Sequence, residues 1–294
     1  MLRLIKAVLR KVFFPERLNV AIATPLAIED PALATSREAY ALDQNKVILS
    51  VKRYHEENFD QVSNAVELAE NQLRKFIAKP NSLDPAKALA NEITLTRFYT
   101  LILGVWCEAR LHKLLYETGA FDEADRSVVY NIKAIEHRWQ AALEIGIRKH
   151  ASLNPMDEIN GQTLSFSKFM IYEEIRNWIL IYFSPAITLR NKIAHAQWTK
   201  PFGNMQGQWI NSSDFRINQN SMDALRNENL LTITLKFNLI KEVSTTINNL
   251  AVDSAIFQTT DFDVRHKIVS GVVSKLNNAD YAKYRASIAG KYGT

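Results

Sequence analysis

One stretch constrains the fold more than any other, because residues 84–118 read as one helix whose second half is apolar on nearly every side. Asp84-Pro85 supplies a favourable cap and first-turn residue, and Gly119 supplies a stop. From Phe98 to Tyr116, apolar residues occupy almost all positions around the helical wheel. Such a helix must be covered on all sides. We therefore expect it to be the central, most buried helix of the protein.

Composition supports a packed helical protein. Of 294 residues, 47% are hydrophobic and only 9 are Gly and 8 Pro, which argues against disorder. The formal net charge of +5 favours contact with polyanions without specifying one. The longest apolar runs are much shorter than the roughly 20 residues that span a bilayer, so we expect no membrane span.

The single cysteine, Cys107, lies inside the apolar helix, where one thiol can form neither an internal disulfide nor a cysteine cluster. We interpret it as a small core residue of a cytoplasmic protein. The sequence also lacks a glycine-rich phosphate loop, paired-cysteine or two-histidine metal spacing, and a nucleophile elbow. We therefore expect no metal and no cofactor.

The first 80 residues read as a helical extension. Leu2–Phe14 has the pattern of a cationic amphipathic helix that docks on the body or a partner, with adhesion to a membrane surface as the alternative. Prolines then indicate a linker that ends near Ser36. One or two helices follow from Arg37 to Lys79, with a kink expected within Tyr54–Asp60.

Two further helices and a junction precede the most informative stretch. An acidic start at Asp122-Glu123 and a regular core stripe predict one helix to about Lys149. The segment 150–165 reads as a loop long enough to cover a groove. Phe166–Phe183 reads as the next helix, and Ser184-Pro185 as a tight junction that starts another.

The helix after Ser184-Pro185 carries Arg190-Asn191-Lys192-Ile193-Ala194-His195 and is expected to stop at Pro201. At 100° per residue, Arg190 lies in the middle of an apolar arc, which is an unusual place for a guanidinium. The arc consists of Ala186, Ile187, Ile193 and Ala194. The simpler interpretation is that Arg190 extends along this surface to water.

Asn191, His195 and Trp198 follow at spacings of four and three and so form a polar and aromatic stripe. Arg190 and His195 are about 140° apart on an ideal helix. They can serve one ligand together only if Arg190 swings round or a second copy of the helix faces this one.

On the central helix, Glu108 and His112 interrupt an apolar seam. An isolated carboxylate is costly there, so Glu108 must be paired, protonated or directed towards a site. A structural pair with His112 and a supporting role in catalysis remain equal alternatives.

After Pro201, Gln208–Asn211 and Phe215–Ile217 read as short strands of a flap. Leu230–Phe237 is ambiguous between helix and strand, whereas Leu239–Val252 is helical in pattern. A last helix is expected over Asp263–Asn277, before a basic tail.

The run from Arg190 to His195, with Leu189 before it and Trp198 after it, resembles the Arg-polar-three-residues-His signature of the HEPN superfamily. The resemblance covers about 84–254. It implies an all-α fold with a HEPN-like four-helix bundle in 84–254, an N-terminal helical extension in 1–80 and a helical tail in 255–294, with a short β-hairpin after the motif helix as an option.

The resemblance also implies a metal-independent endoribonuclease, acting as a toxin or an antiviral defence effector. RNA supplies its own nucleophile, the 2′-hydroxyl. An imidazole suits proton transfer and a guanidinium suits phosphate. His195 would move a proton, Arg190 would stabilise the charge on phosphorus, and Asn191 would orient His195 or donate to phosphate. Many family members place a Glu near the active groove, and Glu108 matches it.

By resemblance, two copies form a homodimer whose motif helices line one groove. Lys192, Trp198 and Lys200 would hold RNA there, although core packing is the simpler role for Trp198. One branch of toxins has a Tyr two residues after the His, whereas Gln197 stands there in this chain. Inactivation by modifying that Tyr is therefore not expected, while an antitoxin or regulatory partner stays open.

Two alternatives remain. In the first, the chain is a non-catalytic HEPN-type dimer that binds RNA, a nucleotide or a partner protein. In the second, it is a helical adaptor in which Arg190 and His195 are structural.

Overall fold

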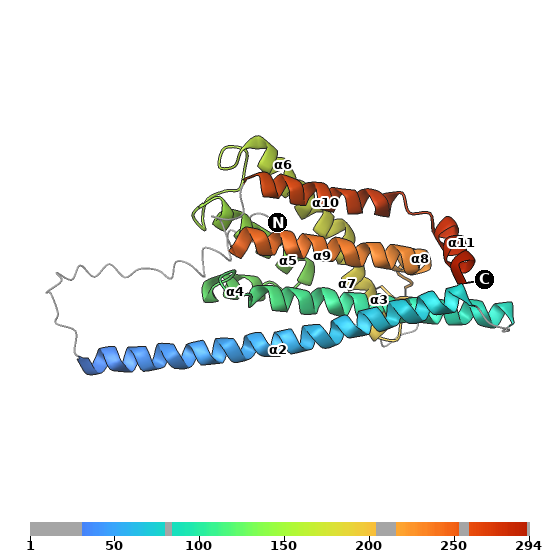
Figure 1. Ribbon diagram of the computed structural model, residues 1–294, viewed down its shortest axis with the longest axis horizontal. Coiled ribbons are helices and arrows are strands. Elements are labelled where there is room, and N and C mark those ends of the chain that lie inside the picture. The colour runs from blue at the N-terminus through green and yellow to red at the C-terminus, as the bar shows by residue number, and fades with distance from the viewer. Residues whose placement is uncertain (1–30, 80–83, 204–215, 253–258, 293–294) are drawn as a thin grey trace.

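The computed structural model describes residues 31–79, 84–203, 216–252 and 259–292. The regular elements of these ranges are all helical, which confirms the expected all-α class. Figure 1 shows long helices stacked side by side, with α2 along one edge. Their bounds are α2 Pro31–Ala78, α3 Pro85–Leu115, α4 Glu123–Tyr130, α5 Ile135–His150, α6 Phe166–Trp178, the π-helix η1 Ile179–Phe183, α7 Ser184–Ala194, α8 Gln219–Asn227, α9 Leu230–Val252, α10 Thr259–Asn277 and α11 Tyr281–Tyr292.

Helix α3 is central, as its apolar pattern predicts. It contacts α2, α5, α7 and α9. Tyr99, Cys107 and Leu114, which share one face of α3, are all fully buried, whereas Phe98 on the other side is 43% exposed. Burial in these apolar surroundings raises the pKa of the Cys107 thiol to about 12, so Cys107 behaves as a core residue.

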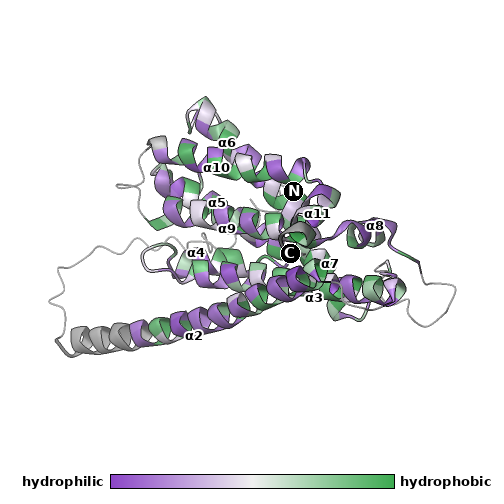
Figure 2. Ribbon diagram, turned by 45° about the vertical axis from the view of Figure 1, so that its right-hand side comes forward, coloured by the Kyte–Doolittle hydropathy of each residue, from purple (hydrophilic) through white to green (hydrophobic). Residues whose placement is uncertain are grey.

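Helix α2 is one uninterrupted helix that begins at Pro31. The predicted linker to Ser36 is therefore too long by several residues, and no break occurs within Tyr54–Asp60. The C-terminal half buries an apolar stripe at helical spacing against the bundle, formed by Val66, Ala69, Leu73 and Ile77. The opposite end extends past the other helices (Figure 1), and hydrophilic residues predominate along the described length (Figure 2).

One hydrophobic core joins the three predicted parts of the chain. Leu73 of α2, Leu111 of α3, Ile247 of α9 and Ile288 of α11 belong to the same cluster of buried residues. The extension and the tail thus contribute to the core that supports the middle of the chain.

The single helix predicted from residue 122 to about 149 is wrong, since α4 ends at Tyr130 and α5 begins at Ile135. Asp122 and Asp125 form a reciprocal capping box at the start of α4. At the break, the Arg138 guanidinium donates to the carbonyls of Ile132 and Tyr130, at 2.6 and 3.3 Å. These bonds satisfy carbonyls that a continuous helix would have bonded internally.

The predicted junction at Ser184-Pro185 is also wrong, because α6, η1 and α7 follow one another without an interruption. Pro185 has no N–H to donate to the preceding turn. The wider π-helical turn of Ile179–Phe183 comes directly before it and accommodates that loss within a continuous helix.

After the motif helix, residues 202–203 are held against residues 216–217 by backbone contacts. Phe202 and Ile217 form an isolated antiparallel bridge, and Gly203 N–H donates to the Arg216 carbonyl at 2.7 Å. The rest of the optional hairpin, including Gln208–Asn211, lies outside the described residues. Helix α8 was not predicted, and α9 resolves the ambiguity at Leu230–Phe237 in favour of helix.

The predicted amphipathic helix Leu2–Phe14 also lies outside the described residues. Within the described part of the chain, no helix is both long and apolar enough to cross a membrane. The basic tail after Asn277 forms a further helix, α11, whose Ile288 is buried.

Candidate functional site

The motif helix ends earlier than its sequence suggests. Helix α7 stops at Ala194, and His195 is its C-cap rather than a residue of a longer helix. Ala196 N–H donates to the Ile193 carbonyl and Gln197 N–H to the Lys192 carbonyl, at 3.0 and 2.9 Å. With Ala196 at φ +61°, this is a Schellman motif. The His195 side chain is exposed at the end of α7.

Arg190 lies at the contact between α7 and α3 and bonds in two directions. Its Nη2 donates to Glu108 Oε2 on α3, and its Nη1 donates to Asn191 Oδ1 at 2.8 Å. Its Nε is enclosed without a hydrogen-bond partner among the described residues. The expected pairing of Glu108 is therefore with the motif arginine itself. The Asn191 side chain accepts from Arg190, and the Asn191 carbonyl accepts from the His195 N–H at 3.1 Å.

A glycine makes room for this arginine. A Cβ at Gly104 of α3 would lie 2.9 Å from Arg190 Cγ and 3.1 Å from the Ala186 carbonyl oxygen, and closer still to Arg190 Cβ. Only a residue without a side chain fits there. Gly104 therefore lets α7 approach α3 closely enough for Arg190 to reach Glu108, one turn further along α3.

The ion pair is half-buried. The side chains of Arg190 and Glu108 are 20% and 33% exposed. Burial lowers the pKa of Arg190, while the nearby Cys107 acts in the opposite direction. An arginine remains cationic under such conditions. The guanidinium is thus partly desolvated, held on one edge by protein and open to solvent on part of its surface.

A second set of polar groups supports Glu108 from the other side. His112 Nε2 lies 4.0 Å from Glu108 Oε1, and His112 Nδ1 lies 3.0 Å from the Tyr130 hydroxyl. When Tyr130 donates to Nδ1, the ring proton is on Nε2 and faces Glu108. The His55 ring of α2 stacks on His112 with 5.3 Å between ring centroids. The contacts of Tyr130 and His55 were not anticipated from the sequence.

Burial lowers the pKa of His112, and the nearby Arg138 lowers it further. Burial also lowers the pKa of His55, with a further contribution from His112. Burial likewise raises the pKa of Tyr130 to about 12. All three groups are therefore held in their neutral forms beside the Glu108–Arg190 ion pair.

The three residues predicted to hold RNA differ in position. Lys192 is buried, its ammonium donates to the Phe202 carbonyl at 2.5 Å, and burial lowers its pKa. Trp198 packs against the buried side chains of Leu189 and Ile193. Lys200 is exposed. Lys192 and Trp198 are thus engaged within the protein, which leaves Lys200 accessible.

Gln197 and Arg97 anchor the segment that follows His195. Gln197 Oε1 accepts a hydrogen bond from Phe202 N–H at 2.8 Å. Arg97 of α3 donates to the carbonyls of Trp198 and Leu225, at 3.2 and 2.6 Å. These bonds fix the path of the chain beyond the Schellman motif.

His195 and Arg190 are brought to the same end of α7 but not into contact. Within the described part of the chain, the imidazole of His195 makes no hydrogen bond or ion pair. Those residues also contain no group of three or more His, Cys, Asp or Glu that could hold a metal ion. The arrangement offers a partly desolvated cation and an accessible imidazole about one helical turn apart.

No family model matches the chain, and neither a curated protein nor a solved structure matches it.

Proposed function

We propose that this protein is a metal-independent endoribonuclease of the HEPN type that cleaves RNA through attack of the 2′-hydroxyl. The products would carry a 2′,3′-cyclic phosphate and a free 5′-hydroxyl. The observation that carries the proposal is the half-buried Arg190, held by Glu108, on the helix that ends at the exposed His195.

In this proposal, Arg190 binds the scissile phosphate. A partly desolvated guanidinium attracts an anion more strongly than a fully hydrated one. The negative charge on phosphorus increases as it becomes five-coordinate, so Arg190 contributes most in the transition state. Glu108 and Asn191 hold one edge of the guanidinium and orient its remaining N–H groups.

His195 is the proton-transfer group. An imidazole can accept the 2′-proton or donate a proton to the 5′-oxygen leaving group near neutral pH. One histidine cannot perform both transfers in the same step. The second group would come from water or from the His195 of a second copy, in a homodimer whose motif helices face one groove. Lys200 would contact a neighbouring phosphate.

Cleavage assays test this proposal. Wild-type protein is expected to cut RNA in the presence of a chelator and to leave cyclic phosphate ends. Replacing the 2′-hydroxyl at the cut position by hydrogen should abolish cutting there, since the nucleophile is removed. Cleavage that persists at the 2′-deoxy position would rule out this mechanism. Growth arrest when the protein is expressed in cells would support a role as a toxin or defence effector. Such a role would in turn suggest an antitoxin or regulatory partner.

A second candidate is a non-catalytic dimer that binds RNA, a nucleotide or a partner protein. The engagement of Arg190 by both Glu108 and Asn191 bears only on the non-catalytic part of this candidate, because the same bonds also suit a structural bridge between α3 and α7. Binding of RNA without cleavage of any substrate would support this candidate.

A further inference from the structure

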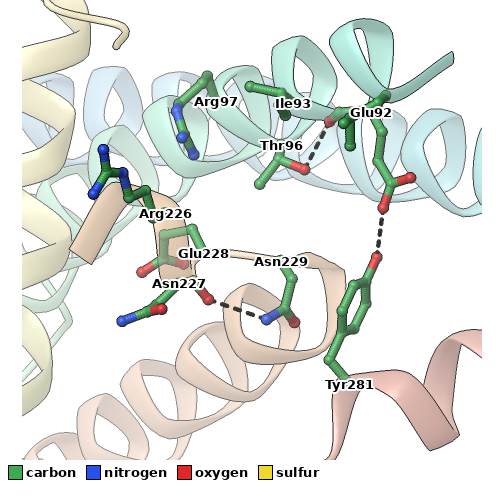
Figure 3. Close-up of a pocket in the computed structure, with 10 residues that line it drawn as sticks. Glu92, Ile93, Thr96, Arg97, Arg226, Asn227, Glu228, Asn229 and Tyr281 are labelled. Carbon is green, nitrogen blue, oxygen red and sulfur yellow. Dashed lines mark hydrogen bonds between the residues drawn. The ribbon is translucent and has the colours of Figure 1, made fainter. Parts of the chain in front are cut away.

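A pocket of about 400 Å³ lies beside the segment that follows His195, between α3, the α8–α9 junction and α11 (Figure 3). Ligand sites in proteins commonly have volumes of this order. Arg97 connects the two features, because it lines the pocket and also bonds to the carbonyl of Trp198, three residues after His195. The pocket is therefore joined to the end of the motif helix by a direct hydrogen bond.

Two carboxylates line this pocket, those of Glu92 and Glu228, and each is paired with a cation of the protein. Glu92 accepts from the Tyr281 hydroxyl at 2.9 Å and from Arg285 Nη2 at 2.8 Å. Glu228 Oε1 pairs with Lys236, whereas Glu228 Oε2 is buried without a hydrogen-bond partner among the described residues. Each carboxylate nevertheless has a cation beside it, Arg285 at Glu92 and Lys236 at Glu228, which offsets its charge towards an incoming anion.

Two guanidinium groups, those of Arg97 and Arg226, remain to contact a ligand in this pocket. Arg97 is only 7% exposed, and its Nε and Nη1 are committed to backbone carbonyls. Its Nη2 has no hydrogen-bond partner among the described residues. Arg226 lies at the same end of the pocket as Arg97, away from Glu92 and Tyr281 (Figure 3), and its side chain is 65% exposed with only a 3.6 Å ion pair to Asp223. A pair of guanidinium groups is well suited to phosphate oxygens.

The remaining walls suit the sugar and base of a nucleotide. Leu89 and Ile93 present apolar surface, with 59% and 46% of each residue exposed. The side-chain amides of Asn227 and Asn229 and the ring of Tyr281 lie across from them (Figure 3). Cations, apolar surface and amides in one pocket match the three chemical parts of a nucleotide.

We propose that this pocket is a subsite for one nucleotide of the RNA strand, next to the scissile bond. Its phosphate lies between Arg97 and Arg226, and its base or ribose packs on Leu89 and Ile93. The inference rests on the proposed ribonuclease function and adds to it a place where the strand is held beyond His195.

The test measures binding separately from cleavage. The probe is a fluorescent RNA with 2′-O-methyl groups throughout, which has no nucleophile, and its Kd is measured by anisotropy over a range of salt concentrations. Arg226→Ala is expected to weaken binding about 5-fold and to reduce the slope of log Kd against log salt by about 0.7, the value for one phosphate contact on a single strand. Ile93→Glu is expected to weaken binding by at least as much, because it replaces the apolar surface under the base or ribose with a carboxylate.

Two matched variants serve as controls. Arg53→Ala removes an arginine on α2 with the same 65% exposure and a comparable 3.7 Å ion pair, to Glu57. Val47→Glu places a carboxylate at a position on α2 that is 53% exposed. Both should bind the probe like the wild type. Thermal unfolding of each variant confirms that it is folded.

The outcomes separate this inference from the proposed function. If wild type cleaves RNA but Arg226→Ala and Ile93→Glu bind the probe normally, the subsite is wrong and the ribonuclease proposal stands. If the wild type neither cleaves RNA nor binds the probe, both proposals fail. In a further arm with AMP alone, Arg226-dependent binding of AMP without any effect on the RNA probe would contradict the assignment to an RNA strand and indicate a free nucleotide instead.

Discussion

Gly104 and Arg190 face each other across the contact between α3 and α7, so closely that the glycine has no space for a side chain. The Arg190 side chain passes this point to reach Glu108, which follows Gly104 by four residues on α3. The position of Arg190 therefore depends on the absence of a Cβ at residue 104 of α3.

Gly104→Ala should destabilise the protein and displace Arg190. The added Cβ forces α7 away from α3, an overpacking cost of about 1–3 kcal/mol, which exceeds the gain of about 1 kcal/mol in helix propensity. Gly271→Ala on α10 is the matched control, since its Cβ would meet no atom within 4 Å. Urea unfolding should show a loss of stability for the first variant and a gain for the second. Equal gains for both would contradict the close approach.

Glu108→Ala should leave the Arg190 guanidinium half-buried without its carboxylate partner. Because both side chains are partly exposed, we expect a loss of about 1–2 kcal/mol rather than the larger cost of a fully buried pair. Glu108→Gln retains a hydrogen-bond acceptor and should lose less stability. Unfolding in urea at low and high salt measures both. An unchanged stability of Glu108→Ala would show that the ion pair contributes nothing.

Ala196→Gly should stabilise the end of α7. Ala196 has φ +61°, where an alanine is strained and a glycine is not, so we expect a gain of about 0.5–1 kcal/mol. Ala194→Gly is the matched control two residues earlier, inside the helix, where the same change should cost about 0.5–1 kcal/mol. Opposite signs in thermal unfolding are the expected result, and a loss in both variants would argue against the Schellman motif.

The stacked His55 and His112 rings should make stability depend on pH. Both have pKa values that burial lowers below the ordinary value of 6.5, so the unfolded chain binds protons more readily. Their contribution is present above pH 6.5 and is lost as the pH falls through the folded-state pKa values. His55→Gln should therefore lose less stability than wild type between pH 7.5 and 5.5. His137→Gln on α5 is a control outside the stack and should retain the wild-type dependence.

Several features followed from sequence pattern alone. The helix predicted over 84–118 is the central helix α3, whose buried residues lie between Thr96 and Leu115, in the part with the most apolar pattern. It is not covered on all sides as expected, since Leu89, Ile93 and Phe98 are exposed. A paired Glu108 was one of three alternatives that the sequence left open, since an isolated carboxylate in an apolar seam is costly. Its partner, Arg190, comes from α7, and only tertiary packing fixes that choice.

The errors have identifiable local causes. Pro185 indicated a new helix, but a π-helical turn absorbs its missing N–H, and periodicity does not report such a turn. The helix predicted to stop at Pro201 was also too long, since α7 ends at Ala194. Ala196 adopts the left-handed conformation that usually requires a glycine, so no residue type there indicated this helix end. Within α7, Ala194 is exposed and Lys192 is buried, the reverse of what the predicted apolar arc indicates.

A signal for the α3–α7 contact was nevertheless present in the sequence. Gly104 interrupts an otherwise strongly apolar helix, and a glycine inside a helix often marks close backbone approach. The contribution of α2 carried no such signal. His55 lies among charged residues, and only the fold brings it onto His112.

The central claim is that His195 transfers a proton during RNA cleavage, and the most direct measurement is the cleavage rate of His195→Ala in the presence of a chelator. We expect this variant to lose cleavage by a factor of about 100 or more, as general acid–base catalysts do, while its thermal unfolding stays close to wild type. His137→Ala should retain the wild-type rate. A folded His195→Ala protein that cleaves RNA as fast as the wild type would contradict the account.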